Sequence, residues 1–168
     1  LAVPLLPTEM YIRYSQSLGV QPTSGEKKEI GPLPQFFADR IGWEELAATV
    51  ATVYRQLSPT EQGECVMIGG SYGYAGAIDY FGPKYGLPNA ISPHNSYYFW
   101  GPGEKAGNIA IVFGFGKADL EKIFSEVQEM VIFDHPYKMP YQRHMSIYLC
   151  KNLKQSISEI WANAHHFI

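Results

Sequence analysis

The chain has 168 residues, of which 46% are hydrophobic and 17% are charged, and its formal net charge is -3. This length suits one domain with a real core, and the apolar content excludes a disordered chain. The negative charge argues against a nucleic-acid-binding protein, because such proteins concentrate lysine and arginine to neutralise phosphates.

The first part of the chain is rich in proline and polar residues. Residues 1–34 contain five of the 12 prolines, and they predict an extended arm with one short helix over about residues 8–18 that ends at Gly19. No apolar run approaches the roughly 20 residues needed to cross a bilayer. Because the sequence starts with Leu1 rather than methionine, we expect it to be part of a longer protein that has a membrane region before this arm.

Residues 35–168 are predicted to form a single α/β domain. Apolar residues recur at helical spacing from Trp43 to Leu57, and Ser58-Pro59 is expected to end this helix. Cys65 and Cys150 lie in apolar, strand-like runs, which favours buried free thiols over a disulfide. The pattern then predicts a strand at 65–69, a helix at 74–85, strands at 89–92 and 108–114, a helix at 117–127, strands at 129–134 and 145–150, and a helix at 156–166.

Strands that alternate with helices imply βαβ units. We therefore expect an α/β fold with three αβα layers and a mainly parallel sheet of about five strands. The last two strands have no room for a helix between them, so an antiparallel pair at one edge of the sheet is also expected.

The stretch "GGSYGYAG" at residues 69–76 fits more than one kind of site. A dinucleotide fingerprint requires G-x-G-x-x-G and an acidic residue after the next strand, and both are absent, so no cofactor is expected. The pentad around Ser71 fits the nucleophile elbow of α/β hydrolases, and Asp134 and His144 follow in the chain order of such a triad. The alternative is that the glycines pack the helix against the sheet and leave its first amides free for an anion or a sugar hydroxyl.

The loop "ISPHNSYYFWGPG" at residues 91–103 follows a predicted strand and gathers aromatic and hydrogen-bonding side chains. Flat aromatic rings beside amide and imidazole groups suit a sugar ring, although a loop that packs back as a small separate core is equally compatible with this composition. The five histidines of the chain are scattered and form no metal-binding motif.

Both segments follow parallel strands, so we expect them to meet at one edge of the sheet and to form one ligand-facing surface. Asp79 is expected to hold the 91–103 loop by a hydrogen bond. The candidate ligand-binding residues are Gly70, Ser71, Tyr72, Gly73, Asp79, His94, Asn95, Tyr97, Tyr98 and Trp100.

Three stretches of the chain are similar to a known family. "LPQFFADRIGWEELAATVATVYRQLSP", "GGSYGYAGAIDYFGPKYGLPNAISPHNSYYFWGPG" and "IYLCKNL" resemble the soluble C-terminal region of bacterial polytopic glycosyltransferases of family 39. These enzymes are similar to dolichyl-phosphate-mannose protein mannosyltransferases and to the aminoarabinose lipid A transferase. The resemblance covers about Val3 to Trp161, and the family often has another small polar residue such as Asn where this chain has Ser71.

The resemblance implies a domain on the periplasmic face of the bacterial inner membrane, as part of an integral membrane protein. Its partners would be the membrane-spanning region of the same polypeptide and a polyprenyl-phosphate-linked sugar or glycan acceptor, with no nucleic acid. The catalytic acidic residues of such enzymes lie in the membrane region, so no catalytic residue is assigned here. The leading hypothesis is an accessory, non-catalytic domain that assists sugar binding. The alternatives are a serine hydrolase-like enzyme that uses Ser71 and a purely structural cap on the membrane region.

Overall fold

The computed structural model describes residues 6–25 and 28–167, which form two compact units. Unit 1 comprises the chain up to Gly42 together with His135–Arg143, and unit 2 comprises Trp43–Asp134 together with the chain from His144. None of the helices within these described residues is both long and apolar enough to cross a lipid bilayer.

Unit 1 is a small helical unit with its own apolar core. It contains helix α1 (Thr8–Ser17), helix α2 (Gln35–Ala38) and the 3-10 turn η3 (Pro140–Gln142). The predicted helix over residues 8–18 is therefore confirmed. Its core consists of four buried residues from both of its chain segments: Leu33, Phe37, Ala38 and Met139. The Tyr11 ring packs edge-on against the Phe37 ring, with 4.8 Å between the ring centroids.

Unit 2 contains the sheet and the helices that cover it. In chain order its elements are α3 (Trp43–Tyr54), α4 (Pro59–Glu64), β1 (Val66–Gly69), α5 (Tyr72–Phe81), η1 (Gly82–Tyr85), β2 (Ala90–Ile91), η2 (Asn95–Trp100), β3 (Ile109–Phe113), α6 (Lys117–Ile123), β4 (Phe124–Phe133), β5 (Met145–Leu153) and α7 (Ile157–Ala164).

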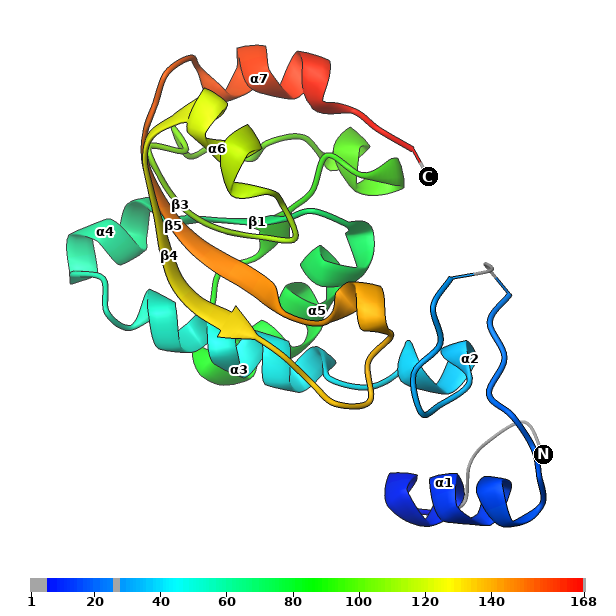
Figure 1. The fold of residues 1–168 in the computed structure, drawn as a ribbon. Coiled ribbons are helices and arrows are strands. Elements are labelled where there is room, and N and C mark those ends of the chain that lie inside the picture. The colour runs from blue at the N-terminus through cyan, green and yellow to red at the C-terminus, as the bar shows by residue number, and fades with distance from the viewer. Residues whose placement is uncertain (1–5, 26–27, 168) are drawn as a thin grey trace. The chain divides into compact units, whose positions relative to one another are not determined.

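The five strands form one sheet in the order β2-β1-β3-β5-β4. Strand β1 pairs in parallel with β2 and with β3, whereas β5 is antiparallel to both β3 and β4. Helices α3 and α5 cover one face of the sheet and helices α6 and α7 cover the other (Figure 1). The expected αβα architecture and the antiparallel pair of the last two strands are confirmed.

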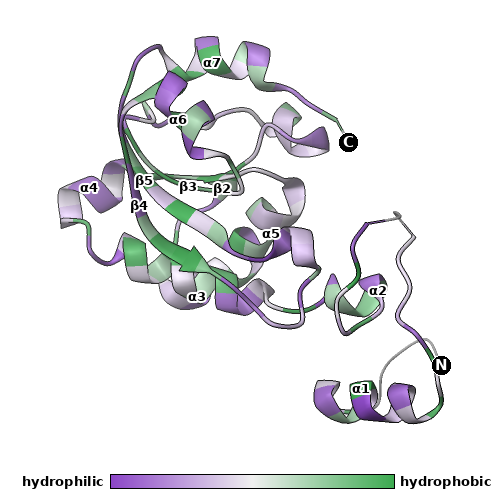
Figure 2. Cartoon of the chain, in the orientation of Figure 1, coloured by the Kyte–Doolittle hydropathy of each residue, from purple (hydrophilic) through white to green (hydrophobic). Residues whose placement is uncertain are grey.

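Alternate residues of each strand point to opposite faces, so the sheet separates two apolar clusters. Met67 and Ile111 are fully buried on the face of α3 and α5, and Ala110 and Val112 are buried on the face of α6. Figure 2 shows hydrophobic colour concentrated on the strands and mixed colour on the helices, as expected for helices that cover a sheet with one side only.

One predicted boundary is wrong, and one helix was not predicted. The helix predicted over 117–127 ends at Ile123, and β4 starts at Phe124. The reason is that this segment pairs with β5, with Phe124 opposite Leu153 at one end and Phe133 opposite Met145 at the other. Ser58-Pro59 follows α3, but it also starts α4. The Ser58 hydroxyl accepts a hydrogen bond from the Glu61 N–H in a capping box, and proline is well tolerated in the first turn of a helix.

Candidate functional site

The glycine-rich turn between β1 and α5 is a close packing of backbone against backbone. A Cβ atom on Gly69 would lie 2.8 Å from the backbone nitrogen of Ala75, and one on Gly70 would lie 2.2 Å from the carbonyl oxygen of Gly114. The Gly70 N–H also donates to the Phe113 carbonyl at 2.8 Å. These two glycines are therefore needed because no side chain fits there.

Ser71 is the N-cap of α5. Its Oγ accepts a hydrogen bond from the Tyr74 N–H at 3.3 Å, so it satisfies one of the free amides at the start of the helix. Asp134 and His144 contact each other, with 3.4 Å from the His144 N–H to Asp134 Oδ1 and 3.7 Å between their side chains. Asp134 follows β4 and His144 precedes β5, whereas Ser71 follows β1, and β3 lies between β1 and β5 in the sheet. Within the described residues Ser71 and His144 share no hydrogen bond.

His94 is buried, with 1% of its surface exposed, where the two predicted segments meet. The Tyr72 N–H donates to its Nδ1 at 3.2 Å, so the neutral ring carries its proton on Nε2. The ring is stacked between those of Tyr72 and His166, with centroid distances of 5.2 and 4.9 Å. Burial and the nearby His166 lower the pKa of His94, so the ring is neutral at pH 7.

The Nε2 atom of His94 is buried and has no hydrogen-bond partner in the described part of the chain. A buried donor without an acceptor costs about 1–3 kcal/mol. His94, one of the predicted ligand-binding residues, joins the loop to the start of α5.

The segment after α7 pairs with the loop after β2. The Asn95 N–H donates to the His166 carbonyl at 3.0 Å, and the His166 N–H donates to the Pro93 carbonyl at 3.3 Å. Asn95 adopts φ of +50°, a left-handed conformation that asparagine tolerates better than most residues. The C-terminal segment is thus part of the candidate site, which nothing in the glycine or aromatic motifs indicated.

Asp79 anchors both β2 and η2. Its Oδ1 accepts from the Ala90 N–H at 2.7 Å, and its Oδ2 accepts from the Tyr97 hydroxyl at 2.8 Å. The predicted hydrogen bond from Asp79 to the 91–103 loop is therefore confirmed. Burial and the Asp79 carboxylate raise the pKa of Tyr97, so its hydroxyl remains a donor at neutral pH.

A second anchor joins η2 to α7. The Trp161 indole N–H donates to the Tyr98 carbonyl at 3.1 Å, and the two rings are stacked at 5.7 Å with an angle of 3° between their planes. The Tyr98 ring also stacks on that of His165 at 4.0 Å. Tyr98 is therefore a packing residue, and its ring is not free to stack on a ligand.

Three aromatic side chains of the site remain available to a ligand. Phe99 and Trp100 are each 72% exposed at the end of η2, and Tyr72 is 51% exposed at the start of α5. The Asn95 side chain makes no hydrogen bond within the residues that the structure describes. We call residues Asn95–Trp100 the aromatic tip: it presents exposed rings and one free amide on a segment held by Asp79 and Trp161.

The remaining candidate chemistry is limited. The described residues contain no group of three or more His, Cys, Asp or Glu side chains that could hold a metal ion. Cys65 and Cys150 are free, buried and located in the two different apolar clusters, and burial raises their pKa to about 11 and about 12. Such thiols are poor nucleophiles at neutral pH.

The strands that precede the two predicted segments are neighbours, as expected, and the Tyr72–His94 contact brings the segments together at the carboxyl edge of the sheet. Any assignment of function depends on these residues. No family model, curated protein or solved structure matches this chain.

Proposed function

We propose that this chain is an accessory, non-catalytic domain of a membrane glycosyltransferase that uses a polyprenyl-phosphate sugar donor. In this proposal it lies on the periplasmic face of the bacterial inner membrane, next to the membrane-spanning region of the same polypeptide, and helps to hold a donor or acceptor sugar. The observation that supports this role is the aromatic tip, where the exposed Trp100 ring accompanies the free amide of Asn95.

A sugar presents a face of C–H groups and a rim of hydroxyls. An exposed indole ring can stack on the first, and an amide can donate to and accept from the second. The hydrogen bonds of Tyr97 to Asp79 and of Trp161 to the Tyr98 carbonyl fix the backbone of the tip before a ligand arrives. Such preorganisation reduces the entropy that binding would otherwise cost.

The contacts of Ser71 and His144 do not support hydrolysis. The Ser71 hydroxyl caps α5, and within the described residues it shares no hydrogen bond with His144, which contacts Asp134. An elbow serine would need a histidine nitrogen within reach to take its proton.

The test is an NMR titration with methyl α-mannoside and with mannose 1-phosphate as a mimic of the donor head group. We expect shifts of the Asn95 and Trp100 side-chain signals and a dissociation constant on the order of millimolar, since in this proposal the membrane region completes the site. Trp100→Ala and Asn95→Ala should weaken binding, whereas Tyr14→Ala, which removes an exposed ring from α1, should not. The proposal would be contradicted if the shifts were confined to β4 and β5, or if Trp100→Ala bound the sugars as tightly as the wild type.

A second candidate is a structural cap that docks on the membrane surface. It is favoured by the exposure of Phe99 and of Phe167, which is 70% exposed, because exposed aromatic side chains suit the membrane interface. This role predicts flotation of the protein with phosphatidylcholine vesicles, loss of flotation in Phe99→Asp, and a flat sugar titration.

A further inference from the structure

The sheet face under α6 and α7 is only partly covered. Strand β1 lies between β2 and β3, where side chains on both faces are normally buried. Met67, on the face of α3 and α5, is fully buried, whereas its neighbour Ile68, on the other face, is only half-buried. Ile157 and Ile160 of α7 are half-buried as well. The apolar sides of α7 and β1 are therefore not fully packed against each other.

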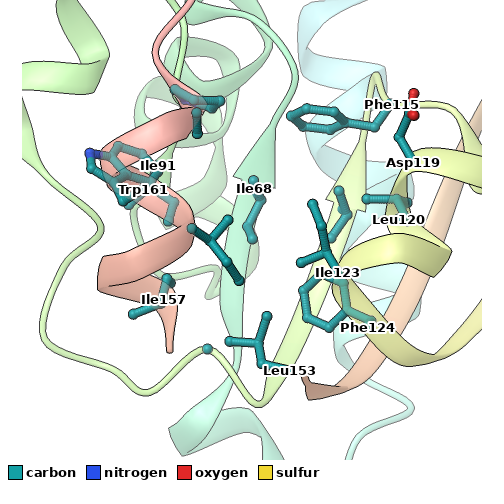
Figure 3. Close-up of a pocket in the computed structure, with 15 residues that line it drawn as sticks. Ile68, Ile91, Phe115, Asp119, Leu120, Ile123, Phe124, Leu153, Ile157 and Trp161 are labelled. Atoms are coloured by element: carbon teal, nitrogen blue, oxygen red, sulfur yellow. The ribbon is translucent and has the colours of Figure 1, made fainter. Parts of the chain in front are cut away.

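A groove of about 90 Å³ lies between α6 and α7 over this part of the sheet (Figure 3). All of its lining residues are apolar except Asp119 and the indole nitrogen of Trp161, which already donates to the Tyr98 carbonyl. The lining residues are Ile68, Ile91, Pro93, Gly107, Val112, Phe115, Asp119, Leu120, Ile123, Phe124, Leu153, Ile157, Ile160, Trp161 and Ala164.

The two ends of the groove differ. Figure 3 shows Leu153 and Ile157 at one end and Phe115 with Asp119 at the other. At the first end a Cβ atom on Gly107 would lie 2.9 Å from the side chains of both Leu153 and Ile157, so the chain packs closely there. Phe115 follows β3, so the other end lies at the carboxyl edge of the sheet, the edge of the candidate site.

We infer that this groove binds a single aliphatic chain of a lipid, which enters from the carboxyl edge of the sheet. The lining has almost no free hydrogen-bonding group, so it favours hydrocarbon over a polar ligand. The small volume of the groove, about 90 Å³, suits one aliphatic chain better than a helix of another protein.

A lipid is the occupant that the surroundings favour. Trp161 lines the groove and also holds the Tyr98 carbonyl, so the wall of the groove is continuous with the aromatic tip. The exposed Phe99 and Trp100 of that tip are suited to a membrane surface, from which a lipid chain would come. Pro93 lines the groove and precedes His94, so a polar head group would lie near the candidate sugar site. This choice of occupant rests on the membrane setting of the proposed function.

The volume of the groove limits how much of an alkyl chain it can hold, and this limit sets the expected dependence on chain length. Each methylene that enters the groove should strengthen binding by about fourfold, and the gain should stop once the groove is full.

The test uses isoleucine methyl NMR with alkyl phosphocholines of increasing chain length below their micelle concentrations, and with geranyl phosphate as an isoprenoid probe. We expect shifts of the Ile68, Ile91 and Ile160 methyl signals and no shift of Ile132, which is exposed on β4 outside the groove. Tighter binding by one class of chain identifies whether straight or isoprenoid lipids are the preferred source.

Ile160→Asp places a carboxylate in the groove at a half-exposed helix position and should weaken binding by at least about tenfold. Ile132→Asp is the matched control, and Ala164→Phe, which narrows the groove without adding charge, covers the case that Ile160→Asp does not fold. The inference would be overturned if Ile160→Asp and Ala164→Phe both bound the lipids as tightly as the wild type. It would also be overturned if the affinity of the wild type did not change with chain length, or if the wild type bound none of these lipids. Ile160 shifts that depend on protein concentration alone would overturn it too, since these would mean that a second copy of the chain covers the groove.

Discussion

Tyr97 donates its hydroxyl proton to Asp79 Oδ2 at 2.8 Å, which joins η2 to the last turn of α5. The other oxygen of the same carboxylate accepts the Ala90 N–H at 2.7 Å, so one side chain holds two segments of the candidate site.

We therefore expect Asp79→Ala to lower the free energy of unfolding by about 2–3 kcal/mol, since it leaves two donors without their charged acceptor. Tyr97→Phe should cost about 1–2 kcal/mol. Urea unfolding of both variants and of the double variant gives the coupling energy. Strictly additive losses would show that the two residues act independently.

His94 should make stability depend on pH near neutrality. Its pKa is lowered in the folded state by burial and by His166, from an unfolded value of 6.5. The unfolded chain therefore takes up a proton that the folded chain resists, so the free energy of unfolding should fall as the pH drops below about 6.5 and should level off above about 7.

The difference between the wild type and His94→Asn isolates this effect, because the asparagine oxygen can still accept the Tyr72 N–H while it cannot be protonated. Urea unfolding between pH 5 and pH 7.5 measures it. The variant should be less stable than the wild type at pH 7.5, because it lacks the stacking of the His94 ring. Its free energy of unfolding should fall less between pH 7.5 and pH 5. Parallel pH profiles of the two proteins would contradict this account.

Gly70 and Gly63 should respond to alanine in opposite directions. A Cβ on Gly70 would meet the Gly114 carbonyl, so Gly70→Ala should destabilise the fold by about 2–3 kcal/mol. Gly63 lies in α4, where a Cβ added to it would have no atom within 4 Å, and Gly63→Ala should stabilise by about 0.5–1 kcal/mol. Thermal melts of both variants check the signs. A neutral Gly70→Ala would mean that the β1–α5 turn and the Gly114 segment can separate at little cost.

Both thiols should be unreactive in the folded protein. Burial raises the pKa of Cys65 to about 11 and that of Cys150 to about 12, so almost no thiolate is present at pH 8. We expect slow reaction with a thiol reagent such as 5,5'-dithiobis(2-nitrobenzoate) in the native state and two fast equivalents in urea. If one thiol instead reacted fast in the native protein, Cys65→Ala and Cys150→Ala would identify it. Its reaction would show local opening of the corresponding face of the sheet.

The sequence was most informative where one local pattern determined the outcome. The apolar spacing of α3, the buried strand β1 and the parallel pairing of β1 with β2 could be predicted, as could the contact of Asp79 with the loop, because an acidic side chain on a helix next to that loop has few other partners. The boundary at Ile123/Phe124 could not, since Ile123, Phe124 and Val127 also fit a helical spacing and only the pairing of β4 with β5 decides between the two.

The site itself was only partly predictable for a different reason. His94 and Tyr98 are the residue types that ligands contact, but their burial depends on His166 and Trp161, which arrive from the far end of the chain. Likewise, the groove beside Ile68 results from the separation of α6 and α7, and no residue pattern within either helix encodes that separation.

The interleaved order of the two units also constrains how the protein is made. Unit 1 needs Met139 to complete its core, while unit 2 needs β5 and α7, which follow residue 143. As the chain leaves the ribosome, the segment before Trp43 must therefore wait until residues 135–143 have been synthesised before it finds its buried partner. Neither unit can complete its core before residue 143 has emerged, so we expect the two native cores to form close together in time.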